Sequence, residues 1–172
     1  MDHLVRNINY TFNTLIQILL KVDEEHLDRV PTLDSWSIGE VVEHVIICSN
    51  GIPDRKTEIV SRNIEQQVPL LKEIFLNNRE KFKADDSLMP REMFHDKYDQ
   101  INEIKAIRKK LSLIARKSEL NGLCLDMEFP SLGFLTRYEW LSFICFHTQR
   151  HIWQIESILT VVKPAAVRTM NN

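Results

Sequence analysis

The chain has 172 residues, of which 44% are hydrophobic and 27% charged, as in an ordinary globular protein with one domain and a substantial core. The formal net charge is −2, and the basic residues are scattered among acidic ones. A nucleic-acid-binding surface needs a dense basic patch, so we expect no nucleic-acid partner.

The sequence also indicates a compartment. No uncharged apolar run approaches the ~20 residues that cross a bilayer, and the N-terminal residues lack the pattern of a signal peptide. The cysteines Cys48, Cys124 and Cys145 are odd in number and have no C-x-x-C spacing. A disulfide framework is therefore not expected, and a cytoplasmic protein without a membrane partner fits best.

Two amphipathic helices are expected in the N-terminal part of the chain. Residues 2 to about 27 carry apolar side chains at three- and four-residue intervals, which predicts one long helix with one buried side. Ser37 and Glu40 form a capping box, so a second helix should begin near Ser37. Trp36 stands immediately before it and is expected to pack at the start of that helix.

Two further helices are expected in the C-terminal part. Residues from about 96 to 119 place isoleucines and leucines on one side and Lys and Arg on the other. Thr136 and Glu139 form a second capping box, which begins a helix that runs to about Val162. Residues 49 to 96 are the least regular region. The second helix either ends near Gly51 and Pro53 or continues through DRKTEIVSRNI. A short helix is expected to begin at Pro69, and KADDSLMPREMFHDK is mostly loop by composition.

The architecture follows from these helices. Four long amphipathic helices without a convincing strand pattern must bury their apolar sides against one another, which predicts an all-α four-helix bundle. We expect residues 1–163 to form a single domain and residues 164–172 to be a disordered tail. The histidines His3, His26 and His95 are expected at the surface.

The last helix carries an unusual histidine pair. His147 and His151 are four residues apart in WLSFICFHTQRHIWQIESI, so they share one helix face. They interrupt a continuous apolar stripe and should therefore face inward. Thr148 follows His147 where a zincin metalloprotease has glutamate, which excludes an H-E-x-x-H protease.

Buried imidazoles need partners. Burial without them costs on the order of 1–3 kcal/mol for each ring, and either a shared metal ion or two hydrogen bonds would supply them. His44 lies on or beside the core face of the second helix and is a candidate third group. Cys48, one turn further on, could lie near it, although a small buried apolar role is the simpler interpretation.

Three segments together resemble one known family. DSWSIGEVVEHV, FPSLGFLTRYEWL and FHTQRHIWQI are similar in order and spacing to motifs of the DinB/YfiT-like superfamily. The shared pattern is Trp then Ser, a helix-borne His, a Pro…Gly…Thr…Glu-Trp stretch, and His-x3-His-x2-Gln. The resemblance covers nearly the whole chain and implies an up-down-down-up four-helix bundle that holds a divalent metal ion.

The resemblance also implies site residues. Carried over one at a time, the metal ligands are His44, His147 and His151, with Gln154 and Trp36 in supporting roles. Nitrogen ligation suits Zn²⁺, Ni²⁺ or Fe²⁺. No catalytic residue and no organic cofactor is assigned.

Three protein ligands leave a coordination position open, as in catalytic metal sites. The favoured interpretation is a metal-dependent enzyme that activates a low-molecular-weight thiol for S-transfer to a small-molecule substrate. One alternative is a YfiT-like hydrolase that uses metal-activated hydroxide, and another is a non-catalytic, stress-related bundle that binds metal or a partner. Homodimers occur in the family, and Phe134 or Leu135 could contribute to such an interface.

Overall fold

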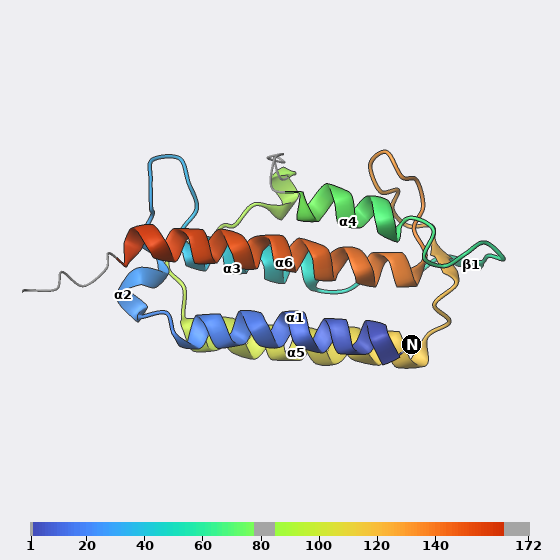
Figure 1. Ribbon diagram of the computed structural model, residues 1–172, viewed down its shortest axis with the longest axis horizontal. Helices are drawn as coiled ribbons and strands as arrows, with labels where there is room; N and C mark the ends of the chain where they lie inside the picture. The colour runs from blue at the N-terminus through green and yellow to red at the C-terminus, as the bar shows by residue number, and fades with distance from the viewer. Residues whose placement is uncertain (1, 78–84, 164–172) are drawn as a thin grey trace, which may run out of the picture.

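The computed structural model describes residues 2–77 and 85–163, which form an elongated helical bundle (Figure 1). The elements are α1 (Asp2–Leu20), α2 (Glu24–Leu27), α3 (Ile38–Ser49), β1 (Thr57–Ile59), α4 (Val68–Leu76), the short 3-10 helix η1 (Asp86–Leu88), α5 (Lys97–Lys117), β2 (Gly122–Cys124) and α6 (Arg137–Val162). The all-α prediction is confirmed. The predicted disordered tail, residues 164–172, lies outside the described residues.

Both predicted capping boxes are present. At the start of α3, the Ser37 backbone N–H donates to Glu40 Oε2 at 2.7 Å, and the Glu40 N–H donates to Ser37 Oγ at 3.2 Å. At the start of α6, Thr136 and Glu139 exchange the equivalent bonds at 2.8 and 3.2 Å. Each box satisfies backbone donors that a helix start leaves free, so these sequence patterns determine where α3 and α6 begin.

Four helices share one apolar core. α1 packs against α5 and α6, and α3 packs against the same two helices, while α4 lies along α6. Figure 1 shows α1 and α6 running in one direction and α3 and α5 in the other, which is the up-down-down-up order. The core between them is built from buried aliphatic side chains and Phe12, which is fully buried. α3 and α6 are thereby fixed side by side at the centre of the bundle.

The prediction of one helix over residues 2 to about 27 is wrong in its extent, because the chain leaves the helix near residue 21 and forms α2 separately. α1 ends at Leu20, and the Val22 backbone N–H closes a turn onto the Leu19 carbonyl at 3.0 Å. Lys97 at the start of α5 donates its Nζ to the Val22 carbonyl at 2.9 Å. In a continuous helix, the Val22 carbonyl would accept a backbone N–H four residues further on, but here it accepts from Lys97. The spacing of apolar residues in one segment cannot reveal such a long-range bond.

A small sheet lies outside the sequence expectations. β1 and β2 pair antiparallel, with Glu58 opposite Leu123. Three-residue strands are too short to give a recognisable alternation of apolar and polar residues. The sheet ties the segment after α3 to the segment before α6.

Candidate metal centre

The candidate site lies between α3 and α6. His44 comes from α3, and His147 and His151 come from successive turns of α6. All three side chains are buried, with exposed fractions of 4%, 8% and 8%. They are buried because the apolar stripes that flank them bring the two helices into contact.

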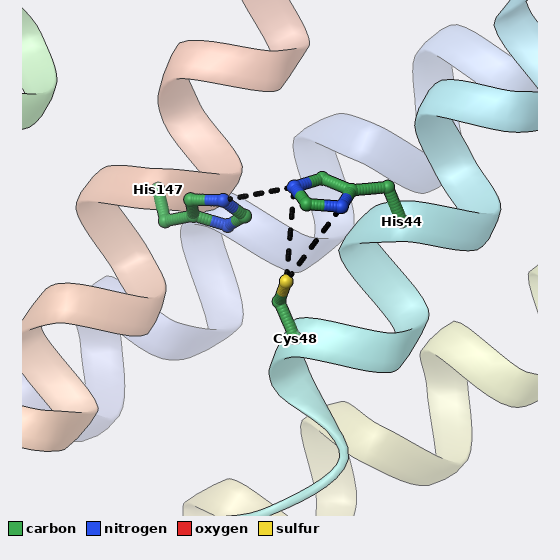
Figure 2. A group of neighbouring side chains, drawn as sticks. All are labelled: His44, Cys48 and His147. Carbon is green, nitrogen blue, oxygen red and sulfur yellow. Dashed lines mark hydrogen bonds between the residues drawn. The ribbon is translucent and has the colours of Figure 1, made fainter. Parts of the chain in front are cut away.

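The three imidazoles converge through their Nε2 atoms. His44 Nε2 lies 3.2 Å from His147 Nε2, and His151 Nε2 lies 3.1 Å from the same atom. Figure 2 shows the His44 ring reaching from α3 toward the His147 ring on α6. The three rings therefore lie next to one another, with His147 between the other two, although 103 residues separate His44 from His147.

The Nδ1 atoms of His44 and His151 form hydrogen bonds to oxygen atoms. His44 Nδ1 lies 2.7 Å from the Leu88 backbone carbonyl, and His151 Nδ1 lies 2.8 Å from Gln154 Oε1. An oxygen acceptor requires the proton on Nδ1, so the Nε2 atoms of His44 and His151 present lone pairs to His147. A single N–H on His147 Nε2 can point at only one of them. A shared cation would accept all three lone pairs, so the donor set fits a metal ion.

The electrostatics of the cluster keep the rings neutral. Burial lowers the pKa of His44 and of His147, the latter well below its ordinary value with the neighbouring His151 and His44 contributing. Burial likewise lowers the pKa of His151 to about 4. Neutral imidazole is the form that binds metal ions, and the three rings are in this form at neutral pH.

Cys48 belongs to the same cluster. Its Sγ lies 3.7 Å from His44 Nε2 and 3.8 Å from His44 Nδ1 (Figure 2). One ligand atom each from His44, Cys48 and His147 lies within 4.8 Å of the others, so this group could hold a metal ion. Cys48 is half-buried, and burial raises the pKa of its thiol to about 12. The sequence favoured a simple apolar role, whereas the structure places the sulfur beside the imidazoles.

Aromatic rings surround the histidines. The Trp36 ring lies 5.0 Å from the His44 ring, and the rings of Phe75 and Phe143 lie 5.9 and 5.5 Å from that of His147. Trp36 was expected at the start of α3, and it also packs on a candidate ligand. Phe75 comes from α4, in the region whose sequence pattern is least regular, so no local pattern identified Phe75 as a neighbour of the histidines.

His26 and the side chain of His95 are buried, so the prediction that these histidines lie at the surface is wrong. His26 is 9% exposed. The His95 side chain is only 3% exposed and makes ion pairs with Asp28 through Nδ1 at 2.6 Å and with Glu43 through Nε2 at 3.1 Å. Both carboxylates come from distant parts of the sequence, which is why composition predicted an exposed loop.

A second correction concerns the proposed dimer surface. Leu135 is fully buried, in a small cluster with Phe129 and Trp140. It therefore cannot serve as an exposed interface residue, and Phe134 is only half-buried rather than prominent.

The fold and the histidine cluster define a helical bundle with a candidate metal centre. The profile of the DinB superfamily matches residues 8–155, and the chain belongs to this superfamily. It is similar to the uncharacterized protein YuaE of Bacillus subtilis (strain 168), with 24% identity over 148 residues that cover 84% of this chain and 90% of the relative. No solved structure matches it significantly. Among the described residues, no helix combines the length and apolar character needed to cross a membrane.

Proposed function

We propose that this protein is a divalent-metal-dependent enzyme whose metal ion is held by His44, His147 and His151. The observation that supports this most directly is the contact of His147 Nε2 with two other Nε2 atoms at 3.2 and 3.1 Å. The carbonyl of Leu88 and the side chain of Gln154 hold the other two rings in the orientation that a metal ligand needs.

The type of donor atom limits the choice of metal ion. Three imidazole nitrogens suit Zn²⁺, Ni²⁺ or Fe²⁺, and affinity order alone does not select among them. Because the rings are neutral, a bound divalent ion keeps its full charge and supplies electrostatic stabilisation for an anionic fourth ligand. The histidine set leaves a fourth position for such a ligand.

The reaction we favour is transfer of a low-molecular-weight thiol to a small electrophile. The thiol gives up its proton to solvent, its sulfur forms a bond to an electrophilic carbon, and the leaving group departs with its electron pair. The acidic side chains next to His44 in sequence are committed elsewhere, since Glu40 caps α3 and Glu43 binds His95 and two backbone N–H groups. A thiolate nucleophile needs no separate general base, and this favours transfer over hydrolysis.

The surrounding side chains give this chemistry a suitable environment. Trp36, Phe75 and Phe143 present ring surfaces to the histidines. These rings limit water beside the reacting sulfur and offer an apolar contact to the electrophile. A substrate with an apolar body next to its electrophilic carbon fits this lining.

The test starts with protein purified without a histidine tag or added metal, followed by elemental analysis. Metal-loaded protein and the His147→Ala variant are then incubated with a small thiol and a chloronitrobenzene electrophile. Thiol-dependent product formation by the wild type and its loss in the variant would support the proposal. Thiol-independent ester hydrolysis would instead favour a hydrolase. Bound metal without either activity would favour a non-catalytic metal-binding bundle.

A further inference from the structure

We propose that Cys48 is a fourth protein ligand of the metal centre and occupies the position that an external thiol takes during transfer. This inference rests on the proposed function and refines it. Cys48 stands one turn after His44 on α3, so both side chains project from the same helix face. Figure 2 shows the sulfur below the His44 ring, on the side that also faces His147.

Three interatomic distances in the cluster are close to those of a four-coordinate site. Metal–nitrogen bonds of ~2.0–2.1 Å and a metal–sulfur bond of ~2.3 Å give tetrahedral edges of about 3.3 Å between nitrogens and about 3.6 Å between nitrogen and sulfur. The Nε2 atom of His147 lies 3.2 Å from that of His44 and 3.1 Å from that of His151. Cys48 Sγ lies 3.7 Å from His44 Nε2. Three separations in the cluster therefore match edges of a tetrahedral shell. The sulfur is also 3.8 Å from His44 Nδ1, so it lies over the face of that ring and would shift toward the Nε2 side when a metal ion binds.

The other cysteines differ from Cys48 in their surroundings. Cys124 is fully buried, and its Sγ donates to the Gly122 carbonyl at 3.9 Å. Cys145 is 5% exposed and belongs to the apolar core of the bundle. Cys48 is the half-buried one, and the contacts recorded for its sulfur are with ring nitrogens of His44. Its position is therefore that of a ligand at the rim of the site.

As a ligand, Cys48 would occupy the coordination position that an incoming thiol needs. It would give up its thiol proton to solvent and offer its thiolate sulfur to the metal ion. An incoming thiol would take the place of that sulfur, and Cys48 would regain a proton as the thiol gave one up. A soft thiolate holds a borderline-soft ion such as Zn²⁺ better than water does, so the exchange favours another thiol over water. The chain's own sulfur thereby selects a thiol as co-substrate.

Cobalt substitution tests this without any activity assay. Wild type, Cys48→Ala, Cys48→Ser and the control Cys124→Ala are loaded with Co²⁺, and folding is checked by circular dichroism. Visible ligand-field bands report bound cobalt, and a near-ultraviolet charge-transfer band reports a bound thiolate. We expect both signals in wild type and Cys124→Ala, and only the visible bands in the two Cys48 variants.

The outcomes separate the two proposals. Visible bands without a charge-transfer band in the wild type would overturn the role of Cys48 and leave the histidine site standing. Folded wild type without any cobalt spectrum would overturn both. Added 2-mercaptoethanol should restore the charge-transfer band in cobalt-loaded Cys48→Ala. The wild-type spectrum should change only at a higher concentration of 2-mercaptoethanol, because the thiol must first displace Cys48. If the wild type and Cys48→Ala respond at the same concentration, Cys48 does not occupy the position that the thiol takes.

Discussion

The Nε2 atoms of His44 and His147 lie 3.2 Å apart, although the residues belong to different helices and are 103 positions apart in sequence. The contact exists because α3 and α6 pack along their apolar stripes, which brings the two rings together inside the bundle. His44 donates its Nδ1 proton to the Leu88 carbonyl, so its Nε2 lone pair faces His147 and is available to a shared cation.

His44→Ala should abolish tight metal binding. The substitution removes one nitrogen donor from α3 and leaves the pair on α6. We expect metal affinity to fall by more than the ~10–100-fold that loss of a supporting contact produces. His3→Ala is the control, because His3 is exposed on α1. Competition with a coloured chelator measures the affinity, and equal values for the two variants would contradict the assignment.

Gln154→Leu should weaken the metal centre without removing a ligand. Gln154 Oε1 accepts from His151 Nδ1 at 2.8 Å and so fixes the ring orientation. We expect an affinity loss of about 10–100-fold, as for other contacts that orient a ligand. Gln154→Glu keeps an oxygen acceptor and should retain most of the affinity. If Leu and Glu at this position lower the affinity equally, the hydrogen bond has no orienting role.

Acid should release the metal at a lower pH than for an exposed histidine site. The pKa of His151 is lowered to about 4 by burial, and those of His44 and His147 are lowered as well. Protons compete with the metal only as the pH falls below the ordinary histidine value of about 6.5 toward these lowered values. Elemental analysis after dialysis at stepped pH measures the release. Retention of the metal well below the pKa of His151 would argue against histidine ligation.

The features that the sequence predicted are those written in local patterns. The capping boxes at Ser37 and Thr136 fix helix starts through residues three positions apart, and the His147–His151 pair shares a face through four-residue spacing. The inward direction of that pair follows from the apolar residues around it. The superfamily resemblance then added His44, which local spacing alone left as one candidate among several roles.

The features that the sequence missed depend on long-range contacts. The break after α1 is stabilised by Lys97, and the His95 ion pairs join residues from three separate segments. Cys48 was not distinguishable from an ordinary buried cysteine until α3 had a definite rotation relative to α6. Tertiary packing decides these positions, and no periodic pattern in a single segment records it.

His95 should make stability depend on pH. Burial of the ring lowers its pKa, but the hydrogen bonds and charges of Asp28 and Glu43 outweigh this and raise it above its ordinary value. A raised pKa in the folded state contributes stability that is fully present below the unfolded value of about 6.5 and is lost as the pH rises through the folded value. Urea unfolding should therefore show His95→Gln losing more stability in mild acid than in mild base. A constant difference across that range would rule out the ion pairs as its source.

Gly39→Ala should destabilise the fold at the same place. A Cβ on Gly39 would lie 2.6 Å from Asp28 Oδ1 and 2.7 Å from His95 Cγ, closer than real contacts allow. The His95 ring is held by Asp28 and Glu43 and cannot move away cheaply, so we expect a loss of about 1–3 kcal/mol, as for other overpacked sites. Urea denaturation of Gly39→Ala, His95→Ala and the double variant forms a cycle. If the ring is the obstacle, Gly39→Ala should cost much less when His95 is already alanine, whereas an equal cost in both backgrounds would place the strain at Asp28 or in the backbone of α3.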